Sequence, residues 1–124
     1  HISDYSGFSY RQFILEKLSS HILKQESNNL NLKDNSFQTL LVSEISMLNS
    51  LFKLYPDQES LFLHRRYILR RLYLNLNQEN EEEISKLKEN EKQFIENHLN
   101  SNQWSSHLLN RHCLWLANVL KWDL

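Results

Sequence analysis

Arginine stands within the apolar face of a helix that this sequence predicts. The segment "SLFLHRRYILRRLYL", residues 60–74, repeats its apolar residues with the period of a helix that buries one face. On a wheel that advances about 100° per residue, Arg65 falls in the middle of the apolar stripe formed by Leu61, Phe62, Ile68, Leu69 and Leu72. A guanidinium buried without a partner is costly, and a carboxylate that accepts two hydrogen bonds from it is the usual remedy. Arg65 therefore requires an acidic partner on a neighbouring helix.

The same pattern occurs three times along the chain. The segments "GFSYRQFIL", "LFLHRRYIL" and "HLLNRHCLW" each contain a bulky residue, an arginine three positions later, and two apolar residues three and four positions after the arginine. The arginines are Arg11, Arg65 and Arg111, and each falls on the apolar stripe of its helix. The bulky residues are Phe8, Phe62 and Leu108. Repeated helical units that bury one face against the next form an α-solenoid, which is the architecture that we expect.

Glutamates occupy matching positions in two of the intervening segments. Glu44 lies on the apolar face of "LVSEISMLNSLF", and Glu91 lies on the apolar face of "KENEKQFIENHL". We predict that Glu44 lies close to Arg65 and that Glu91 lies close to Arg111, each pair within one helical hairpin. Pairing between successive hairpins is the alternative, and the sequence does not decide between the two arrangements.

Glycine and proline are nearly absent, with one of each among 124 residues. Few tight turns are then available, and the plentiful Leu, Glu, Lys and Gln favour helices, so the predicted class is all-α. We expect antiparallel helical hairpins stacked as an α–α superhelix, in a single solenoid segment over residues 1–124. The expected helices span residues 4–24, 36–54, 58–75, 80–99 and 102–121.

These helices divide the chain into repeat pieces. Residues 36–75 and 80–121 are each expected to form one hairpin. Residues 1–24 have the pattern of a second helix alone, without the first helix of their hairpin. The polar segments 25–35 and 76–80 are predicted loops. Because the chain does not begin with methionine and opens directly on a helical pattern, we expect it to be a piece of a longer protein.

The repeated segments resemble the repeats of protein prenyltransferase α subunits. In that family the first helix of a hairpin is Leu-rich with an inward Glu, and the second opens with a signature similar to Asn-Tyr-x-x-Trp-x-x-Arg-Arg. "DYSGFSYRQFIL" and "QESLFLHRRYIL" match this signature with Phe in the Trp position, and "NQWSSHLLNRHCLWL" matches it more loosely. The resemblance implies structural repeat positions at Tyr5, Phe8, Arg11, Glu44, Phe62, Arg65, Glu91 and Arg111.

In two features that depart from the family signature, the chain resembles one branch of the family. Phenylalanine replaces the signature tryptophan, and a long Asn-rich insertion follows residues 1–24. Both suit the divergent branch of protein prenyltransferase alpha subunit repeat-containing proteins. This resemblance implies a non-catalytic α-type subunit of a geranylgeranyltransferase, which scaffolds a β subunit of the Rab geranylgeranyltransferase type. The resemblance also implies that the β subunit carries the zinc and the isoprenoid pocket, so no cofactor is expected in this chain.

The family's lysine near the isoprenoid diphosphate is absent from this chain. In the farnesyl and type I enzymes it stands just before the Asn-Tyr of one repeat, and the matching positions here are Ser3 and Asp57. No catalytic residue is therefore expected. Arg66, which lies off the apolar stripe, and Trp122, near the chain end, are the candidates for contact with a partner; a solvated face is the alternative for Arg66.

Metal and nucleic-acid sites are not expected. His112 and Cys113 are adjacent and point about 100° apart on a helix, and the chain has no second cysteine to join them and His107 in a zinc site. The net charge of −1 and the acidic run "ENEEE" weaken a nucleic-acid interface.

A cytoplasmic location is expected from three features. A single cysteine excludes an internal disulfide and fits a reducing compartment. No apolar run approaches the roughly 20 residues needed to span a membrane, and the first residues lack a signal-peptide pattern.

The alternative to an α-type subunit is a helical-repeat interaction scaffold without a role in prenylation.

Overall fold

The computed structural model describes residues 5–28, 36–76, 81–101 and 106–124. Its helices are α1 (Tyr5–Asn28), α2 (Ser36–Leu54), α3 (Glu59–Asn75), α4 (Glu81–Ser101) and α5 (Ser106–Trp115), which continues as a short π-helix, η1 (Leu116–Leu120). The described residues contain no strand, which confirms the all-α prediction. None of these helices has the length and apolar character needed to cross a membrane.

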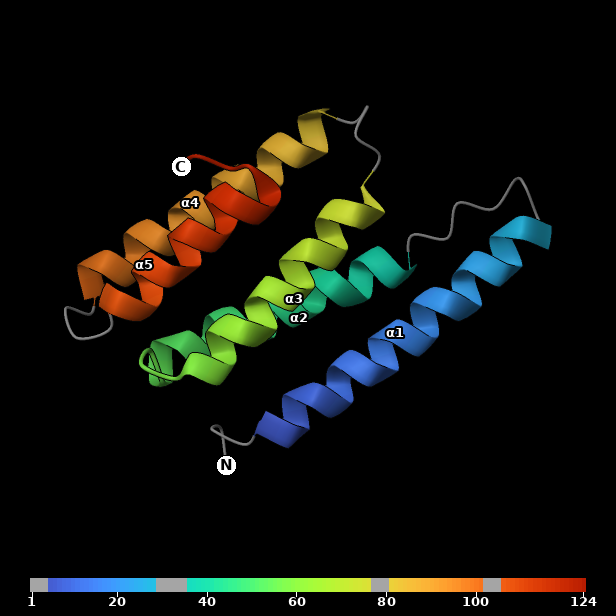
Figure 1. The fold of residues 1–124 in the computed structure, drawn as a ribbon, viewed down its shortest axis with the longest axis horizontal. Coiled ribbons are helices and arrows are strands. Elements are labelled where there is room, and N and C mark those ends of the chain that lie inside the picture. The colour runs from blue at the N-terminus through green and yellow to red at the C-terminus, as the bar shows by residue number, and fades with distance from the viewer. Residues whose placement is uncertain (1–4, 29–35, 77–80, 102–105) are drawn as a thin grey trace.

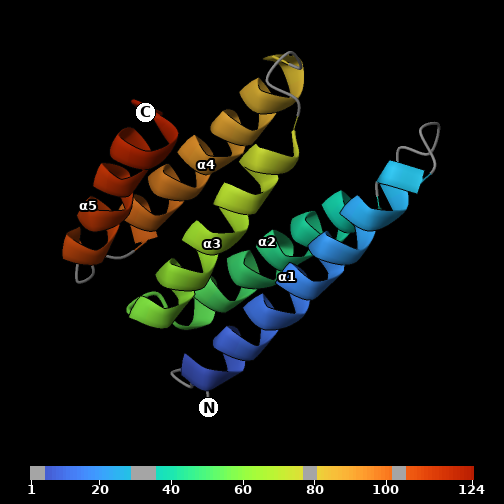
Figure 2. The same ribbon diagram turned by 45° about the vertical axis from the view of Figure 1, so that its right-hand side comes forward.

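The five helices lie in two layers (Figures 1 and 2). Helix α3 lies between α1 and α5 and packs against both, while α2 and α4 lie behind α3 and α5 in the view of Figure 1. Helices α2 and α3 form one antiparallel hairpin, and α4 and α5 form the next. The hairpins were predicted from the sequence; their continuation into a superhelix remains a prediction.

The turn between α2 and α3 is built around Pro56. Leu54 ends α2, because the ring of Pro56 cannot continue a helix and disfavours helical geometry at the residue before it. The amide of Tyr55 still donates to the carbonyl of Leu51 at 2.8 Å, and Leu61 donates to Gln58 at 3.2 Å as α3 begins. The short connection keeps the two helices antiparallel and in contact along their length.

Two predicted helix ends were wrong. Helix α1 continues to Asn28, four residues into the predicted loop 25–35, because Gln25 and Glu26 favour helix despite the polar character of the segment. Helix α4 continues to Ser101 rather than residue 99. Of the predicted loops, Leu76 follows the end of α3, and residues 29–35 and 77–80 lie outside the described residues, as does the predicted start of α5 at residue 102.

The core is shared by all five helices. Its buried members include Leu15 of α1, Leu41 of α2, Ile68 of α3, Phe94 of α4 and Leu109 of α5. The rings of Phe52, Phe62 and Phe94 meet edge to face, with centroids 4.8 to 6.3 Å apart. This cluster joins the α2–α3 hairpin to α4, and it holds the two hairpins in one register.

The C-terminal residues fold back onto the helices. Lys121 adopts a left-handed conformation (φ 61°, ψ 34°), which ends the π-helix, and the amide of Trp122 donates to the carbonyl of Leu116 at 3.0 Å. The Trp122 ring then packs against Tyr73 and is only 2% exposed. The prediction that Trp122 faces a partner was therefore wrong, because this turn directs the indole against buried residues of α3 and η1.

Candidate functional site

A buried ion pair joins the two hairpins. Arg65 of α3 donates from Nε and Nη2 to the carboxylate of Glu91 on α4, at 2.7 to 3.2 Å, and both side chains are at most 2% exposed. Its Nη1 donates to Oδ1 of Asn49 on α2 at 2.8 Å. The guanidinium also lies 3.6 Å from the centre of the Phe94 ring. Arg65 therefore bonds to the first helix of its own hairpin, α2, and to the first helix of the next hairpin, α4.

Glu91 also receives a hydrogen bond from its own hairpin. His112 of α5 donates from Nε2 to the Glu91 carboxylate, and its Nδ1 accepts from Nε of Arg66 at 3.4 Å. This arrangement assigns the neutral form of His112 with its proton on Nε2. Arg66, predicted as a partner-facing residue, is half-buried and donates this hydrogen bond to the imidazole of His112.

The same cluster occurs one hairpin earlier. Arg11 of α1 donates from Nε to Glu44 of α2 at 3.0 Å and also from Nη2, while Nε2 of His64 on α3 donates to Glu44 at 3.0 Å. Nδ1 of His64 accepts from the side chain of Gln12 at 3.2 Å. Each glutamate thus receives an arginine from the preceding hairpin and a histidine from its own. We call these the Glu44 cluster (Arg11, Glu44, His64) and the Glu91 cluster (Arg65, Glu91, His112).

The predicted pairs Glu44–Arg65 and Glu91–Arg111 were both wrong. The alternative, pairing between successive hairpins, is the arrangement that the structure contains. Arg65 pairs with α4 because the stacking of the hairpins brings Glu91 to its guanidinium, while His64 occupies the place beside Glu44 within the first hairpin. A helical wheel gives the face of each side chain and not the helix that will cover that face.

Arg111 does not lie in the core as predicted. Its side chain is 65% exposed and approaches Glu59 at 3.8 Å. The buried polar residue of α5 is its neighbour His112, which corresponds to His64. The third repeat is therefore displaced by two residues from the alignment of the three arginines. A signal for this exists in the sequence: Leu109, His112, Leu116 and Leu120 have the same spacing as Leu61, His64, Ile68 and Leu72.

The other predicted repeat positions differ in burial. Phe62 is fully buried in the core, and Phe8 is half-buried with its ring stacked on His64 at 4.8 Å. The side chain of Tyr5 lies outside what the structure describes. His64, His112 and Asn49 were not predicted as contacts of these charged groups, although each follows the helical spacing of its buried neighbours.

Burial and charge together set the ionisation of both clusters. Burial alone raises the pKa of Glu91, but the charge of Arg65 and the hydrogen bonds from His112 and Arg65 outweigh it and bring the pKa to about 2. Burial lowers the pKa of His112 and of His64 below the ordinary value, and their glutamates offset this only in part. At neutral pH each cluster therefore contains an anionic carboxylate between a guanidinium and a neutral imidazole.

Acid should destabilise the protein in two stages. Because the pKa of His64 and of His112 is lowered from 6.5, the unfolded chain binds more protons just below this pH, and stability falls as the pH drops through it. Glu91 adds a second loss as the pH falls from 4.5 toward its folded pKa of about 2. Urea unfolding at a series of pH values measures both stages.

The His112→Gln variant is the control for the first stage. Gln removes the titrating imidazole but keeps a side-chain donor for Glu91, so the loss of unfolding free energy between about pH 7.5 and about pH 5.5 should shrink. An unchanged loss in both His112→Gln and His64→Gln would contradict the assignment of this stage to the buried histidines.

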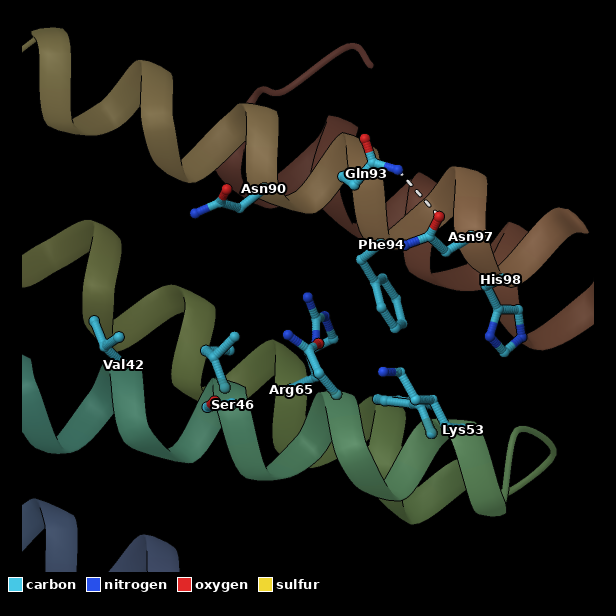
Figure 3. Close-up of a pocket in the computed structure, with 12 residues that line it drawn as sticks. Val42, Ser46, Lys53, Arg65, Asn90, Gln93, Phe94, Asn97 and His98 are labelled. Atoms are coloured by element: carbon cyan, nitrogen blue, oxygen red, sulfur yellow. Dashed lines mark hydrogen bonds between the residues drawn. The ribbon is translucent and has the colours of Figure 1, made fainter. Parts of the chain in front are cut away.

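The two clusters are suited to holding hairpins together rather than to catalysis. Among the described residues, every buried side-chain nitrogen and oxygen atom has a hydrogen-bond partner. No group of three or more His, Cys, Asp or Glu residues in the described part of the chain is placed to hold a metal ion. A cavity of about 500 Å³ opens beside Arg65, between α2 and α4 (Figure 3).

Comparison with known proteins identifies relatives of one kind. Protein prenyltransferase alpha subunit repeat-containing protein 1-B of Xenopus laevis is 30% identical over 95 residues, which cover 59% of this chain and 22% of that protein. Protein prenyltransferase alpha subunit repeat-containing protein 1 of Homo sapiens is 32% identical over 90 residues, covering 55% of this chain and 22% of the human protein. The protein of the same name from Danio rerio is 31% identical over 85 residues, covering 55% and 20%.

The chain spans about a fifth of the length of these curated relatives. No family model matches it, and no solved structure gives a significant match. Over the matched stretch the chain is similar to protein prenyltransferase alpha subunit repeat-containing proteins, and this similarity supports a relationship to their family.

Proposed function

We propose that this chain is an α-subunit-like repeat segment of a protein prenyltransferase of the geranylgeranyl type, which scaffolds a catalytic β subunit. The similarity to three protein prenyltransferase alpha subunit repeat-containing proteins is the observation that carries the proposal. The β subunit of Rab geranylgeranyltransferase is the partner that we propose, and the cytoplasm is the proposed location. Zinc and the isoprenoid chemistry belong to that partner, so this chain contributes no catalytic residue.

The structure of the clusters supports a scaffolding role. Both use their charged groups to bind one hairpin to the next, which leaves them no free acid, base or nucleophile. Hairpins joined in this way present their outer helix faces in a constant register, as a partner that contacts several repeats requires.

Association with a β subunit is the test of this proposal. The full-length protein should co-elute in gel filtration with the β subunit of Rab geranylgeranyltransferase when the two are expressed together. The β subunit of farnesyltransferase is the matched control, and it should elute separately. Elution of the protein apart from both β subunits would contradict the proposal.

A helical-repeat interaction scaffold without a role in prenylation is the second candidate function. The satisfied buried polar groups favour it, because they explain the repeat pattern by packing alone. Separate elution from every prenyltransferase β subunit, together with an intact helical fold by circular dichroism, is the result that this candidate predicts.

A further inference from the structure

A groove separates the first helices of the two hairpins. Helices α2 and α4 form its walls, and Arg65 of α3 lies at its floor (Figure 3). Its volume is about 500 Å³, which is within the range of sites that bind ligands. Helices α3 and α5, the second helices of the two hairpins, pack against each other in the other layer.

The lining of the groove contains no acidic residue. None of its 12 residues is Asp or Glu, although the chain contains 15 of these. The nearest buried carboxylate, that of Glu91, is covered by Arg65 and is only 1% exposed. Lys53 adds an exposed positive charge at one end of the groove. An acidic ligand would therefore meet the charge of Lys53 and no carboxylate among the residues that line the groove, while the charge of Asp57 acts on His98 from outside this lining.

Side-chain amides line both walls. Asn49 stands on α2, and Asn90, Gln93 and Asn97 follow one face of α4 at helical spacing. Gln93 donates to the Asn97 side chain at 3.0 Å, which orients these two amides relative to each other. A side-chain amide carries both a donor and an acceptor, so it can pair with the N–H and C=O of a peptide backbone.

The length of the groove fits a short extended segment. On α2 the lining runs from Val42 to Lys53, a span of about 16 Å at the rise of an α-helix. An extended chain of about five residues covers the same distance. Val42 and Asn90 lie at one end of the groove and Lys53 and His98 at the other, so the two ends differ in polarity.

We propose that the groove between α2 and α4 binds an extended acidic peptide segment of a partner protein. A carboxylate of that segment pairs with Lys53, and its backbone amides bond to the side-chain amides on the groove walls. Alternate side chains of an extended peptide point to the same side, so acidic residues at every second position face the groove together. The inference is independent of a role in prenylation.

Fluorescence anisotropy with two defined probes tests the proposal. A fluorescein-labelled peptide of four Gly-Glu repeats should bind the full-length protein, and the matched peptide of four Gly-Gln repeats should bind more weakly. Lys53→Ala should weaken binding of the Gly-Glu probe by about threefold, as for an exposed ion pair. Asn90→Ala should weaken it by about fivefold, as for one lost hydrogen bond.

Two substitutions outside the groove serve as controls. Lys92→Ala removes an exposed charge from α4, and Asn110→Ala removes an exposed amide from α5, and neither residue lines the groove. Both variants should bind the Gly-Glu probe as tightly as the unaltered protein. The proposal is overturned by equal binding of the two probes, by absence of binding, or by losses in the control variants as large as those of Lys53→Ala and Asn90→Ala.

Discussion

Replacing Arg65 with methionine should lower the unfolding free energy by about 3–5 kcal/mol, the usual effect of breaking a buried ion pair by removing one partner. The substitution keeps an unbranched apolar side chain but removes the guanidinium, which leaves the Glu91 carboxylate, 1% exposed, with the hydrogen bond from His112. It also removes the contact with the Phe94 ring. Urea unfolding at neutral pH, followed by circular dichroism, measures the change.

Arg11→Met is the matched control for this prediction. Arg11 holds the same place in the Glu44 cluster, but its side chain is 46% exposed, so the loss should stay below about 1 kcal/mol. The double variant Arg65→Met, Glu91→Leu should recover part of the loss, because no unpaired charge remains in the core. Equal losses in Arg65→Met and Arg11→Met would show that the buried pair contributes no more than an exposed one.

Phe62→Ala should lower the unfolding free energy by about 3–5 kcal/mol, the range for removing a buried ring. Phe62 is fully buried, and its ring meets Phe52 at 4.8 Å and His98 at 5.4 Å. The cavity would open where the first hairpin meets α4, so little collapse of the surroundings is available to reduce the loss. Thermal and urea unfolding measure the effect.

Phe13→Ala is the control for the loss of a phenylalanine ring. Phe13 lies on α1 and is 55% exposed, so its removal should change the unfolding free energy by less than about 1 kcal/mol. A small effect at Phe62 as well would contradict the role of the aromatic cluster in joining the hairpins.

Helical structure and the break between α2 and α3 could be predicted from local signals. One glycine and one proline exclude a turn-rich fold, and Pro56 ends α2 through sterics within its own neighbourhood. The predicted starts of α2 and α3 lie within one residue of those observed. The end of α1 was missed because asparagine-rich polar sequence is compatible with both a loop and a solvent-exposed helical turn.

The inward direction of Arg65 and Glu91 could be predicted, but their partners could not. Arg65 and Glu91 follow the apolar period of their own helices, and both are buried. Which glutamate Arg65 binds depends on how the hairpins stack, since Glu44 and Glu91 both face the core side of their helices. His64 donates a hydrogen bond to Glu44 and occupies the place beside it, and Arg65 pairs with Glu91.

The sequence by itself determined the all-α class, the hairpin order and the inward direction of Arg65, Glu44 and Glu91, because these follow from helix propensity and periodicity within one segment. Only the tertiary structure decided the pairing across hairpins and the burial of Trp122, and it also decided between Arg111 and His112 as the buried polar residue of α5. Each of these depends on the rotation and displacement of one helix against another. That geometry is set by side-chain packing between residues far apart in the chain, and a helical wheel for one segment does not contain it.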